Sequence, residues 1–451
     1  MADKDISESP VRELLRRFFI TFLLGVVVYR LGVVVPIPGV DAGALRSIVT
    51  AGSESNDPLS AVLRYADMFN GGAIQNASIF GLGITPYISA SIIFQLLTFS
   101  IPSLKALQKE GEGGRRKINQ YTRYATLGIC LVQSAIASYA LYFYPSSNGV
   151  TIVDQSQYTH WAIFTFQSTV VITTGSMLLL WLCEQITRFG IGNGVSVVIM
   201  IGILSYMPVV FAGMGNNLGN LLLIMVFCLL IIAAIVVVVQ AVRRIGLEQQ
   251  RRVQGNKVYG GAQTTLPLKL NQANVIPVIF ASPVMMVMAI AAQKLAADGM
   301  IPGLDSMLAF GTPGHRYVYA GLIYAFTFFY IGITFDLFDL SNHFKQAGFF
   351  VRGIKPGKNT VDYIAGILKR ITFVGAIFLA AIAIMPEVAT TFLPVGNQVA
   401  NTLLGGTGLL IIVGVMIDIM QKVSTFLLAQ QYQGLGGGGG AAPARKSGKR
   451  F

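Results

Sequence analysis

Apolar stretches of roughly 20 residues alternate with short polar segments along nearly the whole chain. A helix of about 20 apolar residues crosses a bilayer core of about 30 Å. Most of these stretches lack the polar face that a helix of a soluble bundle carries. We therefore expect ten transmembrane helices, with approximate bounds 18–36, 79–99, 121–143, 160–183, 194–212, 218–242, 272–293, 316–336, 367–387 and 405–428.

Composition supports this interpretation. Of the 451 residues, 53% are apolar and only 12% are charged, whereas a soluble chain carries about 25% charged residues. The sequence thus predicts an all-α polytopic membrane protein. The glycine-rich and then basic segment 434–451 cannot bury enough apolar surface to fold, and we expect it to be a disordered tail.

The net charge of +13 is explained by topology. If the N-terminus is cytoplasmic, 28 of the 33 Lys and Arg residues fall on the cytoplasmic side, and four (Arg46, Arg64, Lys294 and Arg316) fall outside. Lys and Arg concentrate in the cytoplasmic loops of membrane proteins. This distribution predicts that both termini are cytoplasmic and leaves little basic charge that would require a nucleic acid.

Three segments have features that a simple transmembrane helix does not need. Segment 60–78, which ends near Gly71 and Gly72, is too short and polar to cross the membrane; it is either an interfacial helix or a re-entrant segment beside a cavity. The second span contains small and polar residues, among them Ser89, Ser91 and Gln95, which are typical of close helix packing. The seventh contains Pro277 and Pro283, which we expect to weaken helix continuity.

Few residues of the sequence indicate catalysis, metal binding or ion transport. We find no catalytic motif and no spacing of His or Cys that would bind a metal. Cys130, Cys183 and Cys228 all lie in apolar stretches, where packing is the expected role. Ionisable residues within or near the spans, the mark of ion-coupled transport, are few: Arg30, Glu184 and Asp418. No cofactor and no metal is expected.

Several long stretches closely resemble the SecY family, the central subunits of the bacterial Sec protein translocase. They are Met68-Phe69 with Gly71-Gly72-Ala73, ASIFGLGITPYISASIIFQLLT (77–98), KEGEGGRRKINQYTRY (109–124), Glu184 to Thr187 with Gly190 to Gly194, LPLKLNQANVIPVIFAS (266–282), and Gly405-Gly406-Thr407 with the apolar run to Asp418. The resemblance covers nearly the whole chain, with the stretches in the family's order.

The resemblance implies two pseudo-symmetric halves, 1–212 and 213–433, around an hourglass pore. It places the pore constriction at Ile84, Ile88, Val195, Ile199, Ile279 and Ile411, where branched aliphatic side chains can close a channel by dewetting. It makes 66–78, within segment 60–78, a plug that includes Met68, Phe69, Gly71, Gly72 and Ala73. It also makes the second and seventh spans a lateral gate, with Ser89, Ser91, Gln95, Pro277 and Pro283 as gate residues.

The resemblance further implies docking of partners on cytosolic loops 243–271 and 337–370, through Arg251, Arg252, Lys257, Arg352, Lys355 and Lys358. The expected partners are SecE and SecG subunits, the SecA motor ATPase, the ribosome, polypeptides that bear signal sequences, and the lipid bilayer of the bacterial inner membrane. Lys355 stands where the family typically has Arg, which changes a planar fork into a point charge.

Two other functions were weighed. A secondary solute transporter would place polar or charged substrate groups at mid-membrane, which an apolar ring does not favour. An intramembrane enzyme would need a catalytic set that the sequence lacks. We therefore expect a protein-conducting channel that passes unfolded secretory polypeptides and releases hydrophobic segments into lipid, and not an enzyme.

Overall fold

The computed structural model describes most of the helical part of the chain. The described residues are 10–51, 67, 69–143, 152–153, 158, 160–212, 218–249, 252–254, 257–259, 263–297, 303–308, 312–335, 337–354, 357–392 and 406–436. The last helix continues to Gly436, so residues 434–436 of the predicted disordered tail are helical. Residues 437–451 lie outside the described part.

The first part of the chain, to residue 212, consists of helices joined by short connections. They are α1 (Pro10–Phe22), η1 (Leu23–Val28), α2 (Tyr29–Val34), α3 (Ala42–Ala51), α5 (Thr85–Ser100), α6 (Pro102–Lys109), α7 (Glu112–Tyr142), α8 (Trp161–Phe189) and α9 (Gly194–Ala212). The first expected span is α1, η1 and α2 in direct succession. The second is shorter than predicted, because residues 79–84 form turns and α5 begins only at Thr85.

The rest of the chain adds α10 (Leu218–Gln240), α11 (Ile276–Ala297), α12 (Leu304–Leu308), α13 (Pro313–Thr334), α14 (Leu337–Ala347), α15 (Lys358–Phe392) and α17 (Gly406–Gly436). Each of the ten expected spans thus corresponds to helix. Among the described residues, seven helices are long and apolar enough to cross a membrane, or eight if the bent pair α5 and α6 is one span; α9 contributes a shorter apolar helix. The chain is an all-α polytopic membrane protein.

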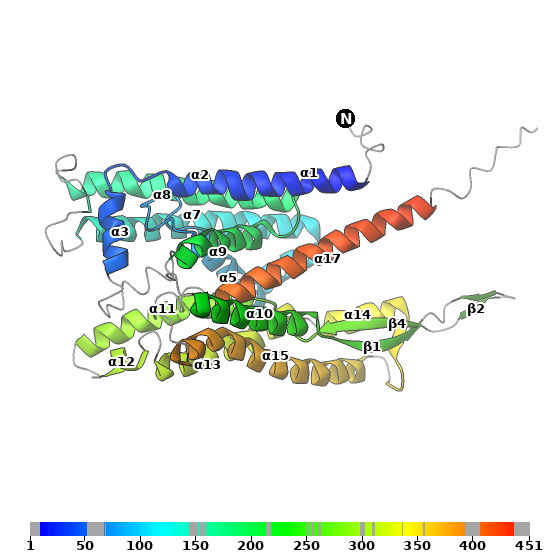
Figure 1. Ribbon diagram of the computed structural model, residues 1–451. Helices are drawn as coiled ribbons and strands as arrows, with labels where there is room; N and C mark the ends of the chain where they lie inside the picture. The colour runs from blue at the N-terminus through cyan, green and yellow to red at the C-terminus, as the bar shows by residue number, and fades with distance from the viewer. Residues whose placement is uncertain are drawn as a thin grey trace, which may run out of the picture.

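The helices form two layers (Figure 1). One layer contains α1, α2, α7, α8 and α9, and the other contains α10, α11, α13 and α15, while α17 runs obliquely between them. The contacts agree: α7 packs on α5 and α8, α13 packs on α11 and α15, and α17 touches α9, α10 and α15. Helix α17 therefore packs against both layers.

Small hydroxyl residues pack α7 against α8. The buried positions of α7 include Thr122, Thr126, Cys130, Ser134 and Ser138, which recur at every fourth residue and so share one face. The Ser134 hydroxyl lies 3.0 Å from the Thr173 hydroxyl of α8. Because lipid and Leu side chains are equally apolar, close packing of small residues and hydrogen bonds hold such helices together.

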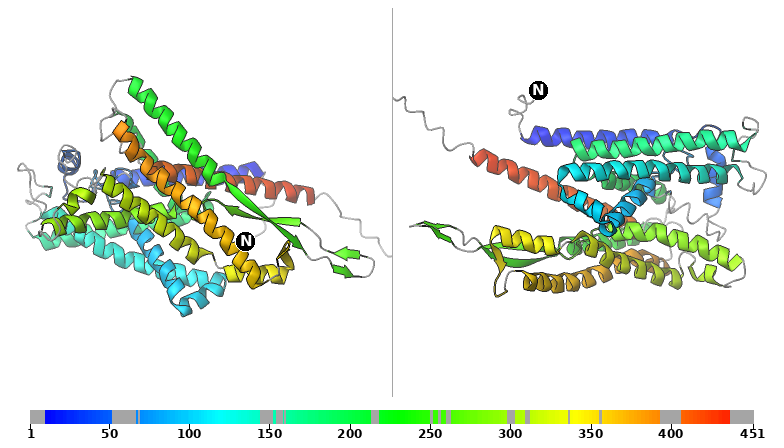
Figure 2. Two further views of the ribbon diagram at one scale, coloured as in Figure 1. Left: turned by 90° about the horizontal axis from the view of Figure 1, so that it is seen from below. Right: turned by 180° about the vertical axis from the view of Figure 1, so that it is seen from behind.

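A small sheet, which the sequence analysis did not anticipate, projects from one end of the bundle (Figure 2). Strands β1 (Val242–Gln249), β4 (Gln263–Lys269) and β5 (Phe349–Val351) form an antiparallel sheet in the order β4-β1-β5, and β2 (Arg252–Gln254) pairs with β3 (Lys257–Tyr259). Val242 pairs with Lys269, and Leu247 pairs with Val351.

The two loops 243–271 and 337–370 therefore meet in one folded unit. Its apolar core consists of Ile245, Leu247 and Leu268 from the sheet, Val351 from β5, and Ile367 and Ile371 from α15. The second loop is also shorter than predicted, because α14 and the first turns of α15 occupy most of it.

Candidate functional site

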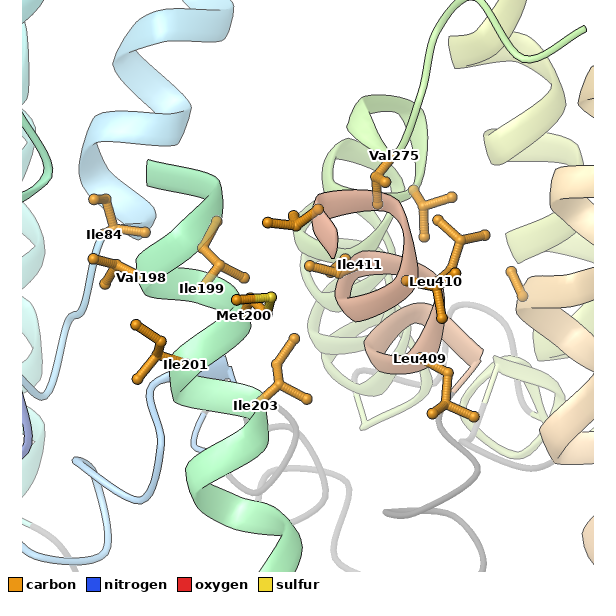
Figure 3. Packing of buried hydrophobic residues seen from close by; sticks show 14 of the residues in the cluster. Ile84, Val198, Ile199, Met200, Ile201, Ile203, Val275, Leu409, Leu410 and Ile411 are labelled. Carbon is orange, nitrogen blue, oxygen red and sulfur yellow. The ribbon is translucent and has the colours of Figure 1, made fainter. Parts of the chain in front are cut away.

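The six predicted constriction residues come together in one apolar cluster. Ile84 precedes α5 and Ile88 lies in it; Val195 and Ile199 lie in α9, Ile279 in α11 and Ile411 in α17. Ile84, Ile199 and Ile411 are buried, and the other three are partly buried and pack against the same cluster. Figure 3 shows Ile84 beside Val198 on the α9 side, with Ile199 and Met200 directed toward Ile411 on α17.

Local turns position these side chains. Ile84 follows Gly83, which has a φ of +58°, a conformation that glycine adopts without strain. Before α9, the Thr187 hydroxyl accepts a hydrogen bond from the Gly194 amide at 2.8 Å, and Gly192 has a φ of +95°. A tight turn therefore links α8 to α9, with Gly192 as its left-handed residue.

The predicted plug packs into the bundle rather than on its surface. Met68 lies outside the described residues, but Phe69 packs against the apolar cluster and Ala73 is fully buried in it. Gly71 and Gly72 have φ values of +64° and +85°, so they turn the chain sharply. A Cβ atom added to Gly202 of α9 would lie 2.6 Å from the Phe69 carbonyl oxygen. The plug backbone therefore touches the helix that carries Val195 and Ile199.

Asp67 organises the plug turns, a role the sequence analysis missed. Its Oδ1 accepts hydrogen bonds from the Ile74 amide at 2.6 Å and the Gln75 amide at 3.2 Å, while its carbonyl accepts from the Asn70 and Gly72 amides. The side chain is fully buried, and this burial raises its pKa to about 6. A carboxylate before a Gly-Gly pair is the sequence signal that could have indicated an Asx-type turn.

Hydrogen bonds also fasten the plug to its neighbours. Asn70 Nδ2 donates to the Gly81 carbonyl at 3.0 Å, which ties the plug to the turn before α5. The Ser78 hydroxyl donates to the Gly32 carbonyl of α2 at 2.9 Å, and Arg46 of α3 donates to Asn76 Oδ1 at 2.7 Å. The segment is thus held by its own Asn70 and Ser78 side chains, by the Gly32 carbonyl of α2 and by the Arg46 side chain of α3.

The predicted gate residues Ser89, Ser91 and Gln95 form hydrogen bonds within α5. The Ser89 hydroxyl donates to the Thr85 carbonyl at 3.1 Å, and Gln95 Nε2 donates to the Ser91 hydroxyl at 3.3 Å. Gln95 also lines a cavity of about 30 Å³ between α5, α11 and α13, together with Ile92, Leu96, Phe280, Phe326, Phe329, Tyr330 and Ile333. Gln95 is therefore a polar residue at the border of an apolar seam.

The prediction that Pro277 weakens the continuity of the seventh span was wrong. Pro277 is the second residue of α11, where the amide would have no partner within the helix, so a proline there breaks no hydrogen bond. Pro283 lies further along α11, and the helix continues through it from Ile276 to Ala297. The described part of the seventh span is therefore one continuous helix.

The predicted docking residues lie around the small sheet, in so far as they are described. Arg251 and Lys355 lie outside the described residues, whereas Arg252 and Lys257 lie on β2 and β3. Arg352 follows β5 and is exposed, with its Nε 3.8 Å from Glu248 Oε1 of β1. Lys358 is the exposed first residue of α15.

Two of the ionisable span residues have partners. Glu184 of α8 accepts two hydrogen bonds of 2.6 Å from the guanidinium of Arg123 on α7, and Asp418 of α17 accepts one of 3.3 Å from Asn274 Nδ2. Arg30 is exposed on α2. In the described part of the chain, no group of three or more His, Cys, Asp or Glu side chains is arranged to hold a metal ion.

A bundle of apolar helices around an aliphatic cluster, with an irregular segment packed into it, defines a polytopic membrane protein of the channel class. The sequence profile of the SecY family matches residues 78–420. The protein translocase subunit SecY of Escherichia coli K12 is 38% identical over 442 residues, which cover 96% of this chain and 96% of that protein. The chain belongs to the SecY family.

Solved structures share the fold. One, described with a SecY plug domain that stabilises the closed state of the translocation channel, aligns with a TM-score of 0.61 and 17% identity over 93% of this chain and 94% of its own. Sec61 from a canine ribosome-channel complex of the endoplasmic reticulum aligns with a TM-score of 0.55 and 16% identity over the same shares. At these identities the likeness concerns the fold alone.

Proposed function

We propose that this chain is the central protein-conducting channel of a Sec translocon, which passes unfolded secretory polypeptides across the bacterial inner membrane. One observation carries the proposal: aliphatic residues from α5, α9, α11 and α17 converge in one cluster, and the segment around Gly71 packs against it. A ring of branched aliphatic side chains excludes water and ions at rest, yet offers an extended chain no fixed binding group. The chain acts as a channel and not as an enzyme.

The assignments of individual residues follow from this function. We assign the ring to Ile84, Ile88, Val195, Ile199, Ile279 and Ile411, and the plug to segment 66–78. Helices α5 and α11 form the lateral gate, through which a hydrophobic segment reaches lipid by its own transfer free energy. Each apolar residue gains tenths of a kcal/mol there, whereas a central charge costs about 2.5–3.5 kcal/mol. The halves 1–212 and 213–433 are the two walls of the pore.

Partner proteins supply the energy for translocation and deliver the polypeptide. The small sheet with Arg252, Lys257, Arg352 and Lys358 is the proposed docking surface for the ribosome and for the SecA motor, and the undescribed Arg251 and Lys355 belong to the same loops. SecE and SecG are the proposed partner subunits. With both termini cytoplasmic, this sheet faces the cytosol, where these partners lie, as the distribution of Lys and Arg favours.

Crosslinking of a stalled substrate tests the function. In a background without Cys130, Cys183 and Cys228, single cysteines at Ile88 and Ile279 should form adducts with a stalled secretory precursor. A cysteine at Val237 of α10, which is 69% exposed on the outside of the bundle, is the control and should form none. A demonstrably stalled precursor that reacts at neither ring position would refute the channel.

The solute transporter remains the competing function. It would require polar groups at the centre of the bundle, where aliphatic side chains from α5, α9, α11 and α17 pack together. The paired Glu184 and Arg123 lie on α8 and α7, respectively, and both are partly exposed. A transporter would show uptake of a small solute that saturates with concentration and needs no polypeptide.

A further inference from the structure

One face of α17 meets the chain segment that leads into α11. Ile411, Gly414, Asp418 and Gln421 are spaced at i, i+3, i+7 and i+10, so they share a face of the helix. Gln421 accepts a hydrogen bond from Lys269 Nζ at 3.0 Å, and Asp418 accepts one from Asn274 Nδ2 at 3.3 Å. The two segments run antiparallel: Lys269 contacts Gln421, Asn274 contacts Asp418, and Val275 lies beside Gly414.

The approach is close in the middle of this face. A Cβ atom added to Gly414 would lie 2.7 Å from Cγ2 of Val275 and 3.5 Å from Oδ1 of Asn274. Only glycine lets the start of α11 sit this near to α17. The Val275 carbonyl in turn accepts the Ile279 amide at 3.2 Å, so the position of Val275 sets where the ring residue Ile279 lies.

Asn274 has an unusual backbone. Its φ is +54°, a left-handed conformation that asparagine tolerates better than most residues but that glycine adopts freely. Its carbonyl accepts a hydrogen bond from Asn271 Nδ2 at 3.0 Å, and its side chain reaches Asp418. Since left-handed residues cluster at sites where the surroundings hold them, the hydrogen bonds at Asn274 account for a conformation that is otherwise unfavourable.

We propose that Asn274 and Asp418 form a clasp that positions the cytosolic end of α11 on α17, and so sets the spacing of Ile279 and Ile411 in the ring. Lys269 and Gln421 extend the clasp to β4, the strand that pairs with β1 of the docking sheet. A partner that pulls on this sheet therefore acts on the two ring helices through the clasp. The effect of the clasp on closure of the pore rests on the function proposed above, whereas its effect on the position of α11 relative to α17 does not.

Asn274→Gly is the sharpest variant, because glycine keeps the left-handed turn and removes only the donor. Asp418→Leu removes the acceptor, and Asp418→Asn keeps an acceptor oxygen and serves as the matched control. Spin labels at Val287 of α11 and Met420 of α17, both 65% exposed, report the spacing of the two helices in the full membrane complex. Anion leak of the resting complex in proteoliposomes reports the seal.

Asn274→Gly and Asp418→Leu should each broaden the interspin distance distribution and raise the leak about fivefold, roughly the effect of one lost hydrogen bond. The double variant should be no leakier than either single one, because both break the same contact, and Asp418→Asn should stay near the parent. The clasp is overturned if Asn274→Gly leaves the distances unchanged, if the two single effects multiply, or if Asp418→Asn leaks as much as Asp418→Leu.

The two readouts separate this inference from the proposed function. The distance measurement needs no substrate and no pore, so it tests the clasp even if the chain conducts nothing. Broadened distances without any leak in any variant would uphold the clasp and contradict the ring as a seal. Asn274→Gly also covers the case in which Asp418→Leu fails to fold, since glycine suits the backbone of that turn.

Discussion

At the scale of single residues, close backbone approaches decide whether the plug is seated. Gly202 of α9 is the plainest example, because a Cβ atom there would lie 2.6 Å from the Phe69 carbonyl oxygen and 3.0 Å from the Tyr29 hydroxyl. Apolar residues on α9 were expected from the sequence, but the need for glycine at this position was not. A glycine inside an apolar span reads as ordinary helix packing until its neighbour is known.

Gly202→Ala should displace residues 69–73 from α9, because the carbonyl oxygen belongs to backbone and cannot rotate away. Overpacking of this kind costs about 1–3 kcal/mol, so the resting complex should leak ions while the helices remain folded. Anion efflux from proteoliposomes measures the effect. Gly321→Ala on α13, where nothing lies within 4 Å of the added Cβ, is the control, and equal leak from both variants would contradict the seated plug.

Asp67 should make the plug sensitive to external pH. Burial raises its pKa to about 6, above the value of about 3.9 of an exposed Asp. Asp67 therefore binds its proton more tightly when the plug is packed in the bundle than when the plug is displaced. The packed plug should be most stable below about pH 4, and this stabilisation should be lost as the pH rises through 6. Leak should fall several-fold when the external pH drops from 7.5 to 5, and a pH-independent leak would argue against this role.

Asp67→Asn is the companion variant, because it keeps an acceptor oxygen for the Ile74 and Gln75 amides and removes the charge. Its leak should no longer change between pH 5 and 7.5. A pH response that persists unchanged in Asp67→Asn would assign the effect to another group and contradict this role of Asp67.

At the scale of the elements, the lateral gate depends on how α5 faces α11 and α13. The sequence showed that Ser89, Ser91 and Gln95 lie in the second span, but not that Ser89 and Ser91 take part in hydrogen bonds within their own helix. It also predicted a weakened seventh span, whereas Pro277 falls in the first turn of α11. Helix starts depend on where the preceding turns end, and tertiary contacts set those turns.

Gln95→Leu should stabilise the closed gate. Gln95 lines the small cavity with Phe280 and Phe326, and an aliphatic side chain there removes a polar group from an apolar seam, an effect of about 1 kcal/mol. Export of precursors with weakened signal sequences should fall about fivefold, while export with an intact signal changes little. Ser91→Ala, which removes only the partner of the amide, should have a smaller effect, and unchanged stringency in Gln95→Leu would exclude this gate.

At the scale of the whole molecule, the small sheet is joined to the bundle by α10, which runs directly into β1, by packing on α15, and by the clasp on α17. The sequence indicated loops 243–271 and 337–370 as docking segments but not that they share a sheet. Pairing of β1 with both β4 and β5 joins residues about a hundred positions apart, which no local pattern reveals. This sheet brings Arg352 near Glu248.

Charge reversal on this surface should weaken docking. Arg352→Glu with Lys358→Glu should reduce binding of ribosomes or motor to the reconstituted complex by at least tenfold at low salt, since steering by exposed charges is strong there and is screened by salt. The resting leak should not change, because the sheet lies outside the bundle. The same reversal at Arg316, on the opposite side of the membrane by the predicted topology, is the control, and equal loss from it would contradict a cytosolic docking surface.

By itself, the sequence determined the membrane class and ten apolar stretches that each correspond to helix, because the length and hydropathy of a span follow directly from the thickness of the bilayer. The six ring positions implied by the resemblance fall in one apolar cluster, and their role as a constriction stays a prediction. Only the tertiary structure decided the Asp67 turn, the contact at Gly202, the docking sheet and the clasp between Asn274 and Asp418. The contact at Gly202, the sheet and the clasp join groups that are distant in sequence, and such contacts depend on how helices pack rather than on any periodicity along the chain. The Asp67 turn is local, but the burial of its carboxylate depends on the same packing.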